Sequence, residues 1–504
     1  MMLDAQSSQL QHALQDLSLI ALSLLCLPFT TLFTSLALVY NYLFPATAIT
    51  RRDAAVRKSG FQPKTILVTG VGMTKGLTLA RMFHSEGHNV IGADFSPYAC
   101  GRVSKSLAKF YTLTKPTSQS GSAPYIEGLL DIISKETVDL WVSCSGVASA
   151  VEDGEAKEIV ERKTACRAIQ FDVATTQLLH EKHTFIDYTR SIGLPVPETH
   201  AIASREAAEK VLLKAAKGRK FIMKPIGMDD ANRGDMTLLP RGSKAETSAH
   251  LSKLRISRQS QWIVQQFVDG PEYCTHALVI NGVVKAFVAC PSAELLMHYE
   301  ALPATDGLSQ MMFEFTRQFA AKHGKGFTGH LSFDFLLDRS AGLAGEGVLY
   351  PIECNPRAHT AVVLFTETPG LVEAYLSILQ PEKKQSNGHT ISTALNANKT
   401  AAPITPHRTD KYYWIGHDFI TRLLRPIFLL STLQADISLS QFGDAVAALG
   451  EHILLWRDGT FERWDPLPWW WLYHVYWPVQ FAIALGRGKK WSRVNVSTTK
   501  MFEC

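Results

Sequence analysis

Residues 329–359 read GHLSFDFLLDRSAGLAGEGVLYPIECNPRAH, and this stretch decides the fold. Apolar and polar side chains alternate over 332–337, and more loosely over 348–353, which predicts two strands joined by a glycine-rich turn. Asp334 lies inside the first predicted strand, whereas Glu353 and Asn355 close the second. Paired strands lie about 5 Å apart, so we expect the hairpin to bring these three side chains together.

The three side chains carry oxygen atoms, which are the ligands that magnesium prefers. Glu353 and Asn355 are two residues apart, so they face the same side of a continuing strand. Arg357 follows two residues later, and its guanidinium group is suited to holding a phosphoryl group. Taken alone, Asp334 and Glu353 fit the simpler interpretation better, in which they are ordinary polar residues of a surface hairpin. The order of parts upstream favours a magnesium and phosphate site instead.

Further signals lie upstream of the hairpin. FIMKP (221–225) is a short apolar strand, and Lys224 within it is costly to bury unless it meets an anion. Lys182 lies in a predicted helix, where alone it would be interpreted as a solvated lysine. WIVQQFVDGPEY (262–273) is an apolar strand that ends in a turn, and Asn281-Gly282 after it is a strong hairpin signal.

This order of parts resembles the ATP-grasp family, whose carboxy-terminal lobe carries Asp and then Glu-x-Asn on adjacent strands as magnesium ligands. The runs FTGHLSFDF and IECNPRAH are similar to one subgroup, the mycosporine-glycine synthases, which use ATP to join glycine to the cyclic enolone 4-deoxygadusol. The resemblance covers most of the chain. It implies an α/β protein with an ATP-grasp fold: a Rossmann-like domain over 63–170 and a two-lobed α+β ATP-grasp domain over 171–380.

The resemblance also implies ATP and Mg2+ as cofactors and a role for each site residue. The expected metal ligands are Asp334, Glu353 and Asn355. The expected nucleotide contacts are Lys182 and Lys224 at the phosphates, Glu272 at the ribose, and Gln265 and Val268 at the adenine. The family often has an acid where Gln265 stands. The expected catalytic residues are Arg357 and Arg233, the latter because residues 226–243 depart from the usual glycine-rich phosphate loop.

These parts together predict an enzyme, an ADP-forming ligase that makes C–N bonds. It would phosphorylate an acid or a vinylogous acid, such as a cyclic enolone, and couple it to the amine of an amino acid in secondary metabolism. The expected partners are therefore these small molecules. An amide-forming carboxylate–amine ligase of another natural-product pathway is the first alternative, because the same site serves either reaction.

A second alternative comes from the stretch between residues 64 and 94. Gly70, Gly72 and Gly76 lie in a turn between a predicted strand and helix, and Asp94 closes the next strand. A dinucleotide-binding unit has a similar pattern, so a nicotinamide-dependent oxidoreductase is a distant alternative. The spacing is looser than in the usual glycine fingerprint, and many α/β domains begin in this way for packing reasons.

The amino-terminal segment, residues 1–62, contains a run without charge over 17–44 that is long enough to cross a bilayer. Acidic residues precede this run and basic residues follow it: Asp4 and Asp16, then Arg51, Arg52, Arg57 and Lys58. The bias predicts a membrane-associated helix, lipid as a partner, and a catalytic domain facing the cytosol. Pro28 leaves open a bent helix lying in one leaflet. We expect a chain beginning near Ser59 to fold and to retain ligation.

The remaining features limit the function less sharply. A net charge of +5 over 504 residues, without a basic stripe, predicts no nucleic-acid partner, and eight scattered cysteines fit reduced thiols. Residues 381–410 are polar and aperiodic, which predicts a flexible linker. Residues 411–504 are predicted to be helical and include five tryptophans between Trp464 and Trp477. This cluster fits either a membrane interface or an aromatic core.

Overall fold

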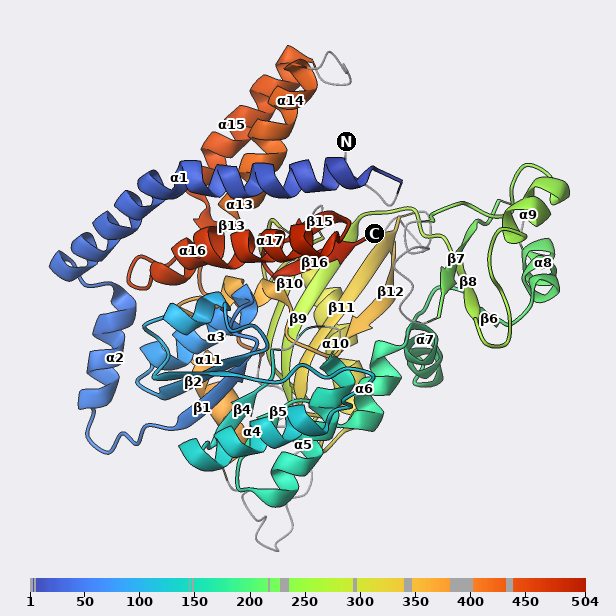
Figure 1. Ribbon diagram of the computed structural model, residues 1–504. Coiled ribbons are helices and arrows are strands. Elements are labelled where there is room, and N and C mark those ends of the chain that lie inside the picture. Colours follow the sequence, from blue (N-terminus) through green and yellow to red (C-terminus); the bar gives the residue numbers. More distant parts are fainter. Residues whose placement is uncertain are drawn as a thin grey trace, which may run out of the picture.

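The structure, a computed structural model, describes residues 3, 6–144, 146, 149–215, 218–226, 235–292, 297–339, 347–380, 402–431 and 438–504 (Figure 1). Three main sheets organise these residues, and helices cover them. Figure 1 shows that the smallest of the three sheets stands apart on one side, whereas the other two lie beneath the long amino-terminal helix.

The first sheet is parallel and has the strand order β3-β2-β1-β4-β5. Its strands are β1 (Thr65–Thr69), β2 (Asn89–Asp94), β3 (Lys109–Thr112), β4 (Leu140–Val142) and β5 (Arg167–Ile169). The helices that connect them are α3 (Thr74–Ser85), α4 (Ala123–Glu136) and α5 (Ala150–Lys163), with a short 3-10 turn η1 (Cys100–Val103). Helices on both faces bury the central strands completely, which explains their continuous apolar sequence.

The second sheet is antiparallel and has the order β6-β8-β7. It contains β6 (Thr199–Ile202), β7 (Phe221–Pro225) and β8 (Trp262–Gln266). Helices α6 (Val173–His180) and α7 (Lys182–Ser191) precede it in the chain. Helices α8 (Arg205–Lys214) and α9 (Lys244–Leu251) lie between its strands in the sequence. A small separate core that includes Trp262 and Phe221 holds this lobe together.

The third sheet is antiparallel, has the order β10-β9-β11-β12, and contains the hairpin predicted from the sequence. Its strands are β9 (Glu272–Ile280), β10 (Val283–Pro291), β11 (Gly329–Asp338) and β12 (Val348–Asn355). One face packs a phenylalanine-rich core against α10 (Gly307–His323). The polar side chains of the predicted site therefore lie on the other face.

This arrangement confirms the predicted α/β fold class, with a Rossmann-like parallel sheet followed by a smaller and a larger antiparallel sheet. The hairpin between β9 and β10 turns at Asn281 and Gly282, which both have positive φ, as the sequence predicts.

The carboxy-terminal region contains short strands as well as helices. After η4 (Thr360–Phe365), α11 (Leu371–Leu376) and η5 (Ser377–Leu379) come β13 (Tyr412–Tyr413), α13 (Ile415–Asp418), η6 (Phe419–Leu424), α14 (Arg425–Ser431), α15 (Leu439–Leu455), β14 (Arg457–Asp458), α16 (Leu467–Trp471), η7 (Leu472–Tyr476), α17 (Trp477–Arg487), β15 (Trp491–Asn495) and β16 (Lys500–Glu503). Arg81 of α3 forms a buried ion pair with Asp465 at 2.9 Å, which ties this region to the first domain. Trp464, Trp469 and Trp477 are buried, so most of the tryptophan cluster is core.

Helices α1 (Gln9–Leu43) and α2 (Thr47–Arg57) begin the described chain. Helix α1 is long and apolar enough to cross a membrane, and little of it is buried. It nevertheless runs along the carboxy-terminal helices rather than away from them (Figure 1). Two of the basic residues that suggested sidedness, Arg51 and Arg52, contact Glu86 and the backbone around α3 instead of standing free.

Candidate active site

The predicted metal ligands meet on β11 and β12. Asp334 lies directly opposite Glu353 in the antiparallel register, and Asn355 lies opposite Ser332. The Asn355 side-chain amide donates a hydrogen bond to Asp334 Oδ2 at 3.2 Å. A bulge between Asp334 and Phe335 interrupts the register at this point, as often happens where a strand directs a functional side chain.

The carboxylates of this group repel one another. Burial, Glu353 and Glu272 together raise the pKa of Asp334 to about 8, although Arg357 and Lys182 act in the opposite direction. Carboxylates crowded in this way favour a bound cation, which would remove the repulsion and keep all of them ionised. The donor set of two carboxylates and one carboxamide therefore fits Mg2+.

Two lysines face the same space from the other lobe and from α7. Lys182 Nζ, at the first residue of α7, lies 3.5 Å from Glu353 Oε2. Lys224 projects from β7, where burial and the charge of Lys182 lower its pKa to about 8. Two ammonium groups near each other favour an anion between them, so phosphate oxygens fit this position.

The expected adenosine contacts lie at the junction of the two lobes. Gln265 is buried on β8, where its Oε1 accepts from Lys224 Nζ at 2.9 Å and its Nε2 donates to Thr199. These bonds make Gln265 a residue that positions Lys224, and its contact with adenine stays a prediction. Val268 is buried between β8 and β9, and Glu272 begins β9 with an exposed carboxylate that accepts from Ser292 Oγ at 2.9 Å.

Of the two arginines expected to act in the reaction, only Arg357 lies within the described residues. Arg357 Nη1 donates to Asn355 Oδ1 at 2.6 Å, which holds the guanidinium group beside the predicted metal ligands. Arg233 lies outside the described residues, as does most of the loop to which it belongs.

The sequence does not predict a second group of polar residues, which lies beside Arg357. Most of its residues come from the first domain and from the third sheet. Lys75 of α3 is almost fully buried, and its Nζ donates to the carbonyl of Ala358 at 2.9 Å. Burial and the nearby Arg357 lower the pKa of Lys75 to about 7. A lysine this costly to bury indicates an anion nearby, which is the argument that identified Lys224 in the sequence.

Three histidines lie near this lysine, two on the sheet and His359 just after β12. The rings of His276 on β9 and His330 on β11 lie 5.4 Å apart, and His276 Nδ1 accepts from the backbone of His359 at 3.3 Å. His330 Nε2 pairs with the Tyr375 hydroxyl at 2.8 Å. Burial, Arg357 and Lys75 lower the pKa of His359 to about 3, and burial and Lys75 do the same for His330. Both rings are therefore neutral hydrogen-bonding groups beside two cations.

The glycines of the dinucleotide-like pattern are explained by the turn that they build. Gly72 donates its backbone N–H to Asp94 Oδ2 at 2.8 Å, so the acidic residue closes the turn itself. A Cβ at Gly76 would lie 2.4 Å from the carbonyl oxygen of Gly70, which shows that close packing requires glycine there. These contacts give the motif a structural role and favour the packing interpretation over nicotinamide binding.

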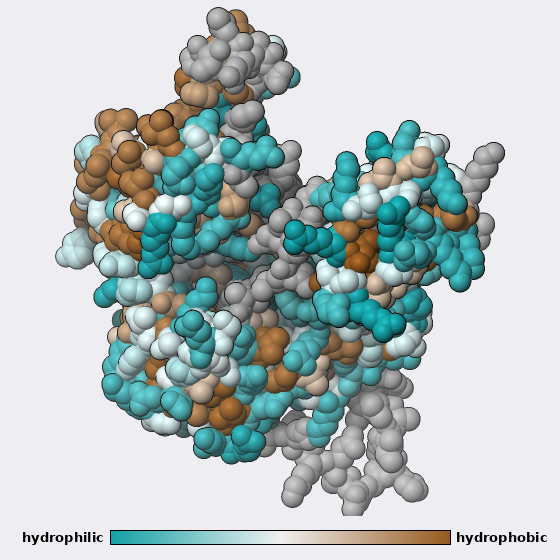
Figure 2. Space-filling view, turned by 45° about the vertical axis from the view of Figure 1, so that its right-hand side comes forward, coloured by the Kyte–Doolittle hydropathy of each residue, from teal (hydrophilic) through white to brown (hydrophobic). Residues whose placement is uncertain are grey.

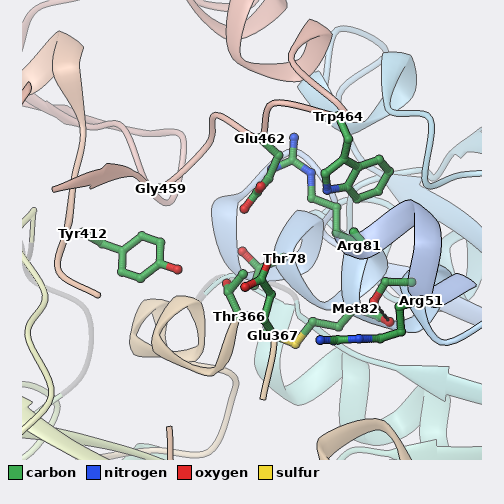
Figure 3. Close-up of a pocket in the computed structure, with 12 residues that line it drawn as sticks. Arg51, Thr78, Arg81, Met82, Thr366, Glu367, Tyr412, Gly459, Glu462 and Trp464 are labelled. Carbon is green, nitrogen blue, oxygen red and sulfur yellow. Dashed lines mark hydrogen bonds between the residues drawn. The ribbon is translucent and has the colours of Figure 1, made fainter. Parts of the chain in front are cut away.

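A pocket shown in Figure 3 lies elsewhere, between α2, α3 and the segments around Tyr412 and Glu462. None of the predicted site residues lines it. Its arginines are engaged: Arg51 contacts Glu86, and Arg81 contacts Asp465. We assign no function to this pocket.

Comparisons with known proteins gave matches only among solved structures; no protein-family model and no curated protein matches the chain. N5-carboxyaminoimidazole synthetase from Staphylococcus aureus, complexed with ADP, has 15% identity and a TM-score of 0.44, covering 60% of this chain and 73% of that one. L-amino acid ligase from Bacillus licheniformis has 13% identity and a TM-score of 0.44, covering 63% and 74%. The biotin carboxylase domain of Hydrogenobacter thermophilus 2-oxoglutarate carboxylase, in complex with MgADP, ADP and bicarbonate, has 15% identity and a TM-score of 0.46, covering 64% and 71%. Similarity this low carries no argument about the reaction.

Proposed function

We propose that this protein is an ATP-dependent, magnesium-requiring ligase that phosphorylates an acid or vinylogous acid and joins it to the amine of an amino acid, releasing ADP. The observation that carries the proposal is the convergence of Asp334, Glu353 and Asn355 with Lys182 and Lys224 at one point between two lobes. A nucleoside triphosphate site requires carboxylates that bind a cation and, next to them, lysines that bind an anion.

In this proposal the charge of each residue determines what it binds. Lys182 and Lys224 hold the phosphate chain, and Asp334, Glu353 and Asn355 hold magnesium. When bound, the metal ion neutralises charge on the phosphate oxygens during transfer. Arg357, kept in place by Asn355, lies where it can stabilise the transferring group.

The acceptor acid would bind on the Lys75 side of Arg357. Its oxygen is negatively charged, and Lys75 with Arg357 supplies two cations, while the neutral ring of His359 supplies a hydrogen bond. Ser332 Oγ is buried on the same sheet and has no hydrogen-bond partner among the described residues, so it is available to a ligand.

The finer assignment is that the acid is a cyclic enolone and the amine is glycine, as the resemblance to mycosporine-glycine synthases implies. The alternative is an amide-forming carboxylate–amine ligase of another natural-product pathway. We test both by measuring ADP release against a panel of amino acids, with and without 4-deoxygadusol. The mass of the product separates an enamine of the enolone from an amide, and no release with any pair would contradict the ligase proposal.

Association with a membrane, with the catalytic lobes facing the cytosol, is also part of the proposal. It is supported by one helix, α1, which has the length and composition of a membrane segment. Sedimentation of the full chain with and without detergent tests it, and a chain that stays fully soluble without detergent would contradict it.

A further inference from the structure

Helix α1 places its polar residues against the protein and its apolar residues outward. A polar stripe recurs along it at intervals of four and seven residues: His12, Asp16, Ser23, Thr30, Thr34 and Asn41. His12, Asp16, Thr34 and Asn41 are the buried residues of the helix. The apolar residues on the opposite side are 53–72% exposed: Leu14, Leu24, Leu25, Phe29, Leu32 and Leu36. A surface helix in water has the reverse arrangement, so water is not the solvent of this side.

The polar stripe is hydrogen-bonded to the carboxy-terminal region at Asp16, Ser23 and Thr30, and a further contact lies at Tyr40. Trp491 Nε1 donates to Asp16 Oδ1 at 2.8 Å near one end. His474 bonds both Ser23 and Thr30, at 3.0 and 2.6 Å. Near the other end, the guanidinium carbon of Arg463 lies 4.9 Å from the ring centre of Tyr40.

These contacts determine how the helix can meet a membrane. From Asp16 to Tyr40 a helix rises about 36 Å, which exceeds the roughly 30 Å thickness of the hydrocarbon core. A helix attached to the protein over this length cannot cross the bilayer without taking the attached helices with it. It can, however, lie in the plane of one leaflet with its outer side in lipid.

A second apolar element stands on the same side of the molecule. Helices α14 and α15 project past α1 (Figure 1), and they expose Phe428 by 58% and Leu439 by 78%. At the base of α15, Leu454 and Leu455 are exposed by 81% and 75%. Figure 2 shows hydrophobic residues gathered on this projection and on the neighbouring upper surface.

Positive charge borders this apolar side. Lys490 reaches the start of α1, where its Nζ donates to the carbonyl of Ser7 at 2.7 Å, and Arg463 lies beside the other end. Arg425, at the start of α14, and Arg487, at the end of α17, are exposed. Helix α15 also carries two exposed acidic residues, Asp444 and Glu451. The basic residues around the apolar side chains of α1 and α14 fit a bilayer that contains anionic lipids.

We propose that the protein docks on one leaflet of an anionic bilayer through this face, with α1 in the membrane plane and the α14–α15 projection inserted beside it. The protein is then monotopic, and both ends of α1 remain on the side of the catalytic lobes. The inference does not depend on the reaction that the site performs.

Flotation of the purified full chain with vesicles tests the docking face. The vesicles contain phosphatidylcholine alone or with phosphatidylserine, and the variants are Phe428→Glu and the combined Leu25→Glu, Phe29→Glu and Leu32→Glu. We expect the combined variant to lower the vesicle partition coefficient about a hundredfold and Phe428→Glu to lower it about tenfold, because each buried charge opposes insertion. Leu213→Glu, at a leucine exposed by 63% on the distant helix α8, is the matched control and should bind as the unchanged protein does.

Orientation needs a separate measurement on the vesicle-bound protein. In a background with Cys26→Ser and Cys504→Ser, cysteines at Ser8 and Thr47 flank α1 and are labelled with a membrane-impermeant maleimide added outside intact vesicles. Labelling at both positions supports the in-plane helix, and protection of one position until the vesicles are opened would overturn it. Unchanged flotation of the combined variant would overturn the docking face. So would a lipid-free dimer that the same variant dissociates, because a second copy would then cover the face.

Discussion

Replacing Glu353 by glutamine removes one negative charge from the centre of the proposed site and changes its shape very little. In the structure this carboxylate lies opposite Asp334 and 3.5 Å from Lys182. The variant therefore separates two contributions of the residue, one to the stability of the fold and one to the reaction.

The expected effect on stability is small. The side chains of Lys182 and Glu353 are 24% and 29% exposed, and ion pairs of this kind contribute under about 1 kcal/mol. The same substitution also relieves Asp334 of a neighbouring charge that raises its pKa, which offsets part of the loss. We expect the free energy of unfolding to change by no more than about 1 kcal/mol.

The expected effect on turnover is large. A metal ligand contributes several kcal/mol of transition-state stabilisation, and a loss of about 4 kcal/mol lowers the rate about 1,000-fold. ADP release at saturating ATP and magnesium measures the rate, and denaturant unfolding measures stability on the same samples.

The matched control is Glu314→Gln on α10, which removes a carboxylate paired with Arg317 far from the site. It should leave both quantities nearly unchanged. Near-normal turnover of Glu353→Gln would refute the placement of the metal, and a variant that loses both activity and several kcal/mol of stability would show a structural role instead.

Three further predictions follow from charges and contacts in the structure. ATP affinity should fall as pH rises above about 8, by up to about tenfold per pH unit, because Lys224 must then take up a proton to bind phosphate. In Lys224→Arg, calorimetric titration should give an ATP affinity that hardly changes with pH over the same range. Lys75→Met should lower kcat or weaken binding of the acid while ATP affinity stays within about twofold, and equal losses of both would place Lys75 in the nucleotide site. A chain beginning near Ser59 should unfold at lower denaturant concentration than the full chain, since it exposes the partners of α1; an unchanged midpoint would contradict the packing of that helix.

The sequence predicts the elements of the site well because their patterns are local. Alternation over 332–337 identifies β11, and the spacing of Glu353 and Asn355 places them on one face of β12. The exact pairing of Asp334 with Glu353 depends on a bulge, which alternation alone does not predict. The lysine of FIMKP is identified by its cost of burial; it is buried on β7 near Lys182, and its contact with phosphate stays a prediction.

The features of the site and of α1 that the sequence does not predict depend on contacts between distant parts of the chain. Lys75 reaches Ala358 across 283 positions, so no local pattern connects α3 with the segment that follows β12. The same holds for His276 and His330, which meet only after β9 and β11 pair. For α1 the sequence predicts a membrane segment that can be removed freely. The structure instead binds its polar stripe to helices more than 400 residues away, a pattern already visible in the spacing of those polar residues.

The proposed ligase cleaves ATP at its γ-phosphate to activate an acid, and phosphorus NMR of the products shows where ATP is cleaved. The protein is incubated with ATP, magnesium, the amino-acid panel and 4-deoxygadusol or candidate carboxylic acids, and each substrate is then omitted in turn. We expect ADP and inorganic phosphate in amounts equal to the ligated product, only when acid and amine are both present, and formed about 1,000-fold more slowly by Glu353→Gln. Formation of AMP and pyrophosphate, or product formation without ATP cleavage, would contradict it.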